Sequence, residues 1–196
     1  MALQTTPDTK ARILAEAERL FAAGGYDGVS MREIAEACGV TKANIYYYFR
    51  DKESLYLEIL QADMEALVSA LDRATQVDGS CRERIARLAR AYWTLMREKD
   101  NLIRLTLRQF GGLEKELQGL VFRYQDEIVR PVEGVLADGV RSGELRPLNT
   151  RLAATSLLGM LSIYVAGRLL QLPLDQPLDQ AVTQTVDLFF DGAAAG

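Results

Sequence analysis

The sequence predicts an all-α protein, and three observations support this fold class. Apolar residues recur with a helical period along nearly the whole chain, and we find no convincing alternating pattern of the kind that strands produce. With 48% hydrophobic and 26% charged residues, the chain can build a packed core and does not have the composition of a disordered protein. Five prolines and fifteen glycines in 196 residues are too few for a loop-rich scaffold.

The first two helices follow from an apolar stripe and a capping sequence. Ile13, Ala17 and Phe21 lie on one helical stripe, and Gly24-Gly25 ends this helix, because glycine readily adopts the left-handed conformation of a C-terminal cap. A second helix, over residues 31–38, begins with the capping box that runs from Ser30 to Glu33.

The next elements are a short helix, a connecting helix and a series of longer helices. Gly39 ends the second helix, Thr41 caps a third that ends near residue 49, and Asp51 caps a fourth that reaches residue 70. Thr150 is expected to cap the uncharged helix near the C-terminus. The remaining expected helices span residues 82–99, 102–110, 113–139, 150–171 and 179–191. This change of length predicts a three-helix domain over residues 1–50 and a helical body over residues 51–196, linked through the fourth helix at about residues 52–72.

The composition excludes several classes of function. The chain has no histidine, and therefore lacks imidazole catalysis and the commonest transition-metal ligand. Cys38 and Cys81 have no CxxC spacing, so we expect neither a metal site nor a disulfide framework, and no cofactor. A formal charge of −4 argues against binding polyanions through bulk charge, so that any nucleic-acid site must be local.

The expected location is the cytoplasm. The N-terminus lacks the basic and apolar regions of a signal peptide. The longest uncharged stretch, residues 152–167, is shorter than the roughly 20 apolar residues that span a bilayer, and no membrane partner is expected.

Residues 34–45 have the spacing of a helix-turn-helix. Ala35 allows two helices to cross closely, and Gly39, four positions later, permits a sharp turn. A plain αα-hairpin without a role in DNA binding is the alternative. The apolar residues that a shared core needs are Ile34, Val40, Ile45 and Phe49.

The third helix presents side chains suited to DNA if Ile45 and Phe49 face inward. Lys42 can reach guanine or a phosphate, and the amide of Asn44 can pair with adenine. Tyrosine hydroxyls donate to phosphate oxygens, although Tyr48 is expected to pack partly inside. Lys52 adds a cation near the free N–H groups of the fourth helix, which together suit a phosphate. The exposed arc comprises Lys42, Ala43, Asn44, Tyr46 and Tyr47.

Residues 9–60 resemble the N-terminal DNA-binding domain of the tetracycline repressor (TetR) family of bacterial regulators. The resemblance is carried by the motifs LFAAGGYDGVS, REIAEACGV and IYYYF, and by the Lys52-Glu-Ser-Leu that follows. It implies a homodimer whose recognition helices enter successive major grooves of a palindromic double-stranded DNA operator, and a C-terminal body that binds a small effector. Carried over by position, the implied DNA-binding residues are Ser30, Arg32, Thr41, Lys42, Ala43, Asn44, Tyr46, Tyr47 and Lys52.

The C-terminal body offers candidates for an effector pocket, although ordinary core packing is the alternative for each bulky side chain. Pockets in helical proteins are mostly apolar with a few polar groups, and arginines can supply these groups or form a solvated face. No effector identity follows. The candidates are Tyr92, Trp93, Met96, Leu105, Arg108, Phe110, Phe122, Arg123 and Tyr164.

A dimer interface is expected from the uncharged helix near residues 152–167 together with the last helix. Apolar and small residues cover both faces of the uncharged helix, so that a single partner helix cannot bury it. Burial within one chain is the alternative. The candidates are Leu158, Gly159, Ser162, Ala166, Val182, Val186 and Phe189.

The expected function is a ligand-responsive repressor that a small molecule releases from its operator. The first alternative is a DNA-binding protein of the same fold without an effector, either an architectural factor or an activator. A small helical enzyme is the second alternative, but the chain has no histidine, no GxSxG and no phosphate-binding glycine loop, and we expect no enzyme. Residues 1–50 contain six basic and six acidic residues, which predicts binding through only a few phosphates.

Overall fold

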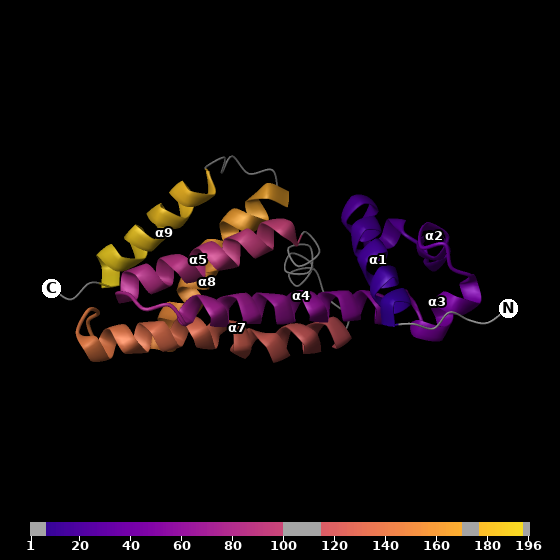
Figure 1. The fold of residues 1–196 in the computed structure, drawn as a ribbon. Helices are drawn as coiled ribbons and strands as arrows, with labels where there is room; N and C mark the ends of the chain where they lie inside the picture. Colours follow the sequence, from indigo (N-terminus) through magenta and orange to yellow (C-terminus); the bar gives the residue numbers. More distant parts are fainter. Residues whose placement is uncertain (1–6, 100–114, 170–176, 194–196) are drawn as a thin grey trace. The chain divides into compact units, whose positions relative to one another are not determined.

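The computed structural model describes residues 7–99, 115–169 and 177–193, and within these ranges the chain forms eight α-helices (Figure 1). The predicted all-α class is confirmed, while the helix expected at residues 102–110 lies outside the described residues. The helices are α1 (Pro7–Gly28), α2 (Met31–Ala37), α3 (Lys42–Tyr48), α4 (Lys52–Thr75), α5 (Cys81–Glu98), α7 (Lys115–Ser142), α8 (Thr150–Leu169) and α9 (Leu178–Ala193).

The chain divides into two compact units, Met1–Asp63 and Met64–Gly196. The division falls inside α4, whereas the sequence suggests a boundary near residue 50. The first turns of α4 therefore belong to the unit that contains α1, α2 and α3.

The first unit has a core of aliphatic and aromatic side chains. Phe21 is fully buried, and its ring lies 5.6 Å from that of Tyr26 and 5.3 Å from that of Tyr56. Gly25 has φ 72° and ψ 163°, which interrupts α1 as the glycine pair predicts, although one further helical turn follows to Gly28. The aromatic cluster thus joins α1 to the start of α4.

The second unit packs α5 against α7, α8 and α9 (Figure 1). Ion pairs reinforce the α5–α9 contact, because Arg82 Nη1 lies 2.6 Å from Asp187 Oδ1 and Arg90 Nε lies 3.1 Å from Asp179 Oδ1. The cap of α8 differs from the prediction: Asn149 Oδ1, rather than the Thr150 side chain, accepts a hydrogen bond from the Leu152 amide at 2.9 Å. Asn149 and Thr150 are adjacent and both residue types favour the N-cap, so the sequence alone does not identify which of them caps α8.

The start of α5 is joined to the end of α7 by a close approach. Glu144 Oε2 accepts a hydrogen bond from the Cys81 amide at 2.7 Å, and a Cβ added at Gly139 would lie 2.6 Å from Cys81 Sγ. Burial raises the pKa of the Cys81 thiol to about 11. Cys81 is therefore a buried residue that packs the start of α5 against the end of α7.

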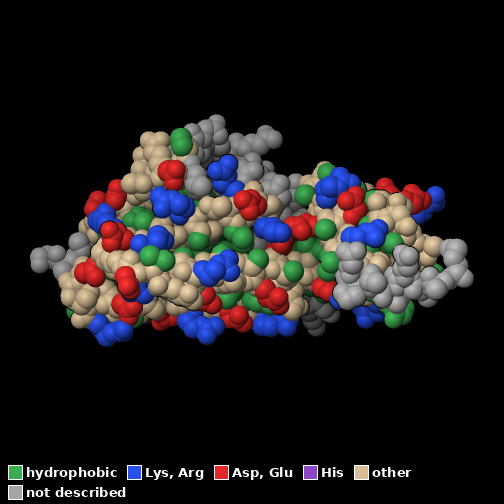
Figure 2. Space-filling model, in the orientation of Figure 1, with side chains coloured by type: hydrophobic (Ala, Val, Ile, Leu, Met, Phe, Trp, Pro, Cys, Tyr) green, Lys and Arg blue, Asp and Glu red, His purple; other side chains and the backbone are tan. Residues whose placement is uncertain are grey.

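No helix within the described ranges is long and apolar enough to cross a membrane. Figure 2 shows basic and acidic side chains interspersed over the visible surface, which fits the small net charge of −4.

Candidate nucleic-acid interface

The helix-turn-helix has the geometry that its spacing predicts. Ala35 is buried at the crossing of α2 and α3, and its carbonyl accepts a hydrogen bond from the Val40 amide at 2.9 Å. Gly39 has φ 65°, a conformation that glycine adopts without the steric cost of a side chain. A backbone hydrogen bond between residues five positions apart therefore closes the turn.

Capping side chains define where α2 and α3 begin. Ser30 Oγ accepts a hydrogen bond from the Glu33 amide at 3.2 Å, and Glu33 Oε2 accepts from the Ser30 amide at 2.7 Å and from its hydroxyl at 2.6 Å. These bonds hold the pKa of Glu33 below its usual value. Thr41 Oγ1 caps α3 by accepting from the Asn44 amide at 3.2 Å. The hydroxyl of Ser30 is thus used within the protein.

The exposed arc of α3 contains four of the five predicted residues. Lys42 and Ala43 are exposed, Tyr46 is 44% exposed and Tyr47 is 65% exposed, while Ile45 is fully buried. The Lys42 ammonium lies 5.8 Å from the centroid of the Tyr46 ring. A cation and two phenol groups are therefore available on one side of this helix.

Asn44 departs from the predicted exposed arc. It lies on the same flank of Ile45 as Tyr48, and both side chains are half-buried. Among the described residues, neither Asn44 Oδ1 nor the Tyr48 hydroxyl has a hydrogen-bond partner, and both atoms are enclosed. In this conformation Asn44 does not present the two-sided amide edge that adenine requires, because its oxygen faces the protein.

A hollow of about 430 Å³ opens beside α3. Its walls come from the end of α1, the start of α2, α3 and the first residue of α4. Arg32, one of its cations, is strongly exposed and pairs with Glu36, with Nε and Oε1 2.7 Å apart. The predicted DNA-binding residues that line the hollow are Ser30, Arg32, Lys42, Tyr46 and Lys52.

Lys52 is not the free cation that the sequence suggests. Its Nζ donates to the carbonyl oxygen of Tyr26 at 2.8 Å and to that of Val29 at 3.0 Å. The ammonium also lies 4.3 Å from the centroid of the Tyr26 ring. The side chain is half-buried, and these contacts bridge residues more than twenty positions apart.

Arg12 is a further contributor that sequence reasoning missed. Its Nη2 donates to the carbonyl oxygen of Cys38 at 2.9 Å, at the end of α2. Cys38 itself is buried, and burial raises the pKa of its thiol. No sequence signal marks this contact, because a backbone carbonyl accepts hydrogen bonds from any donor that the fold brings near.

The structure separates the residues predicted to line an effector pocket. Tyr92, Trp93 and Met96 are buried, and the Tyr92 hydroxyl lies 2.7 Å from Ser162 Oγ. Tyr164 packs edge-on against Trp93 at 5.5 Å between ring centroids. By contrast, Phe122 is 69% exposed on α7 and Arg123 is exposed beside it, so neither lines an enclosed cavity. Leu105, Arg108 and Phe110 lie outside the described residues.

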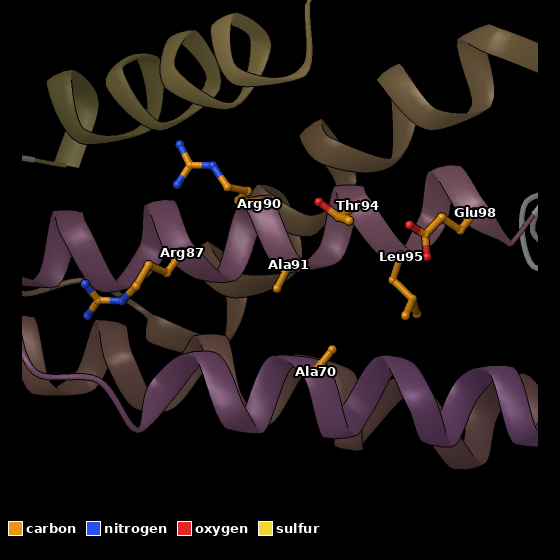
Figure 3. Close-up of a pocket in the computed structure, with 7 residues that line it drawn as sticks. All are labelled: Ala70, Arg87, Arg90, Ala91, Thr94, Leu95 and Glu98. Atoms are coloured by element: carbon orange, nitrogen blue, oxygen red, sulfur yellow. The ribbon is translucent and has the colours of Figure 1, made fainter.

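A groove of about 380 Å³ lies between α4 and α5 (Figure 3). Ala70 faces it from α4, while Ala91 and Leu95 point into it from α5. The polar groups lie at its edges, and Arg90 points away toward α9, where it pairs with Asp179. The remaining lining residues are Arg87, Thr94 and Glu98.

The predicted dimer residues lie on two different sides of their helices. Leu158, Val182 and Val186 are buried within the single chain, which is the alternative to a dimer contact for these three. Ser162 is half-buried and turned inward by its bond to Tyr92, and Phe189 is half-buried. The side chain of Ala166 is outside the described part of α8. Gly159 is exposed.

An exposed stripe on α8 carries no charge. We call it the α8 outer face, and it consists of Leu152, Ser156, Gly159 and Ile163. Leu152 is 65% exposed and Ile163 is 51% exposed, while Leu188 on α9 is 69% exposed. The α8 outer face therefore leaves apolar side chains exposed to water in the single chain.

Two family models match the chain. The model described as "Bacterial regulatory proteins, tetR family" matches residues 13–59, and the model described as "Tetracyclin repressor-like, C-terminal domain" matches residues 78–165. The first match contains α2, the turn and α3, and the second begins just before α5.

The chain is also similar to individual regulators. The fatty acid metabolism regulator protein of Bacillus subtilis is 24% identical over 149 residues, which are 76% of this chain and 77% of that protein. The crystal structure of FadR from Bacillus subtilis in complex with stearoyl-CoA has a TM-score of 0.79 at 21% identity, covering 93% of this chain and 98% of that one. AibR in complex with isovaleryl coenzyme A and operator DNA has a TM-score of 0.71 at 24% identity, covering 92% and 97%. At these identities the structural likeness concerns the fold.

Proposed function

Because the chain belongs to the TetR family of bacterial regulatory proteins, we propose that it is a repressor that binds a palindromic operator as a homodimer and is released by a small-molecule effector. The observation that carries this proposal is the α2–α3 helix-turn-helix with Lys42, Tyr46 and Tyr47 on its exposed side. Its relatives are named as regulators, so we assign it a regulatory rather than an enzymatic role in the bacterial cytoplasm.

We propose two groups of DNA contacts. Ala43 and Tyr47 face the bases, since a methyl group and a phenol ring can contact thymine methyls. Lys42 and Tyr46 hold phosphates at the hollow, where Arg32 can join them by leaving its exposed pair with Glu36. Ser30 and Thr41 act mainly by starting α2 and α3, and Asn44 reads a base only if its side chain rotates outward.

Tyr46→Phe should weaken binding to all DNA sequences by about the same factor. The change removes one hydroxyl, and a hydrogen bond to a charged group contributes about 1.5–3 kcal/mol. Because a phosphate carries no sequence information, the ratio of operator to non-specific affinity should stay constant. Fluorescence anisotropy with operator and scrambled duplexes measures both affinities. Tyr124→Phe, on α7, is the matched control and should leave both unchanged; a loss confined to one base-pair variant would contradict the phosphate assignment.

We further propose that the effector is a coenzyme A thioester. Two observations support this class: a relative is named for fatty acid metabolism, and two structures of similar fold contain acyl-CoA molecules. Such a ligand joins an apolar acyl chain to phosphates. The α4–α5 groove of this chain supplies an apolar floor from Ala70, Ala91 and Leu95, which suits the acyl chain of such a ligand.

The functional proposal is tested by selecting bound sequences from random DNA and then adding CoA thioesters of increasing acyl length. We expect a palindrome with half-sites about 10 base pairs apart or a multiple of this spacing. The matching thioester should raise the operator Kd by about 5–150-fold, while free coenzyme A should not. Recovery of no preferred sequence would remove the DNA-binding proposal, and an unchanged Kd with every thioester would remove the effector class.

A further inference from the structure

We infer that Lys52 is a positioning residue for operator binding and that it is not a phosphate ligand. It ties the start of α4 to the segment that ends α1 and directly precedes α2. The inference rests on the operator binding proposed above, because its effect is measured on DNA affinity. It is carried by the contacts of the Lys52 ammonium with the α1–α2 segment.

The placement of Lys52 explains why its ammonium turns back into the protein. Lys52 is the first residue of α4, where the helix dipole disfavours a positive charge. Asp51 satisfies this helix end instead, since its Oδ1 accepts a hydrogen bond from the Ser54 amide at 2.8 Å. The Lys52 side chain therefore gains nothing by staying over the start of α4, and its head group lies over the end of α1.

The end of α1 is a favourable site for a cation. The last carbonyls of a helix have no partner within the helix and carry partial negative charge. The Tyr26 carbonyl, in the last turn of α1, and the Val29 carbonyl, just after it, accept from Nζ at 2.8 and 3.0 Å. The face of the Tyr26 ring, 4.3 Å from Nζ, adds a cation–π contact. Two of the three ammonium protons are thus used within the protein.

This tie holds the peptide on which α2 is built. Val29 directly precedes Ser30, whose amide and hydroxyl both donate to Glu33 in the capping box. Attraction between Lys52 and Glu33 adds to the hydrogen bonds that lower the pKa of Glu33. Because α2 crosses α3 at Ala35, a displaced start of α2 changes the direction in which α3 meets the DNA. Lys52 therefore acts on the operator through α2.

The salt dependence of operator affinity separates this role from a phosphate contact. Each phosphate contact that is lost lowers the slope of log Kd against log salt by about 0.9. Lys42→Met, which removes an exposed cation of α3, should lower the slope by this amount in each protomer. Lys52→Met should raise the Kd by about 10-fold, the equivalent of one ordinary hydrogen bond, because only part of the lost bonding energy is expressed in the position of α3, and the wild-type slope should be retained. A fall in slope equal to that of Lys42→Met would overturn the inference.

Two further variants and one control measurement distinguish this role from a role in fold stability alone. Lys52→Arg can still donate to both carbonyls and should recover most of the affinity. A side chain that only stabilised the fold would leave the Kd of the fully folded dimer unchanged at 25 °C, and that result would also overturn the inference. If Lys52→Met does not fold, Lys52→Gln, which is uncharged but retains an N–H donor, replaces it in the same salt series.

Hydrogen exchange on the protein without DNA tests the tie independently of any operator. The amides of Glu33 and Ile34, which form the first hydrogen bonds of α2, should exchange about 10-fold faster in Lys52→Met and at the wild-type rate in Lys42→Met. Unchanged exchange in folded Lys52→Met would overturn the inference. Faster exchange together with no selectable operator would instead place the failure in the proposed function.

Discussion

Replacing Gly159 with glutamate is expected to convert the dimer to monomers and to weaken operator binding by about 100-fold or more. Gly159 lies in the middle of the α8 outer face, between Leu152 at 65% exposure and Ile163 at 51%. This stripe carries no charge, and we propose that it forms the two-fold contact together with Leu188 of α9. A carboxylate placed there would lose water without gaining a partner.

Because the dimer is expected to have a two-fold axis, the substitution places a glutamate on each side of the same contact. In an isologous interface the same patch from both protomers meets, so two glutamates approach each other and add repulsion to the loss of hydration. A monomer contacts one half-site alone and loses the effective concentration that the second recognition helix gains within the dimer. The loss of affinity should therefore exceed that of any single DNA-contact variant.

Gly134→Glu on α7 is the matched control. Both glycines are helical and exposed, and a Cβ added at either would meet no atom within 4 Å, so the two substitutions impose the same local change. Light scattering at micromolar concentration should show a monomer for Gly159→Glu and a dimer for Gly134→Glu. A Gly159→Glu dimer with wild-type operator affinity would place the dimer contact on a different surface.

The helix-turn-helix could be predicted from sequence because its constraints are local. Ala35, Gly39 and the capping residues Ser30 and Thr41 each act on atoms within about five residues. Small size, positive φ and a capping hydroxyl are properties of the residue types themselves. The sequence pattern therefore predicts both helices, α2 and α3, and the sharp turn between them.

The orientation of α8 could not be predicted in the same way. Residues 152–167 contain no charged side chain, and in such a helix nothing in the sequence marks which side faces water. The structure turns Leu158 inward and Ile163 outward, although both are aliphatic residues of similar size. Only packing against α5, α7 and α9 makes this distinction.

The roles of Lys52 and Arg12 were hidden for a different reason. Each donates to backbone carbonyls that lie 23 to 26 residues away, and a carbonyl leaves no mark in the sequence. A lysine at a helix start beside a DNA-binding motif suggests a phosphate contact on residue type alone. Distinguishing a phosphate contact from an internal tie requires the distances.

Phe21→Ala is expected to destabilise the first unit by about 3–5 kcal/mol, the range for a fully buried phenylalanine. The Phe21 ring has no exposed surface and packs against the rings of Tyr26 and Tyr56, which bring together α1 and the start of α4. Its removal leaves a cavity at this junction, and it also loosens the ring that faces the Lys52 ammonium. Operator binding should fall with the population of folded first unit.

The loss should be large enough to appear as a separate melting transition. At about 4 °C or more for each kcal/mol in a domain of 60–100 residues, the first unit should melt at least roughly 12 °C earlier. Phe122→Ala provides the matched control: the same atoms are removed from a ring that is 69% exposed on α7, so the change should stay within about 0.5 kcal/mol. Calorimetry and circular dichroism measure both variants. An equally small shift in both variants would mean that the buried ring of Phe21 does not stabilise the contact between α1 and the start of α4.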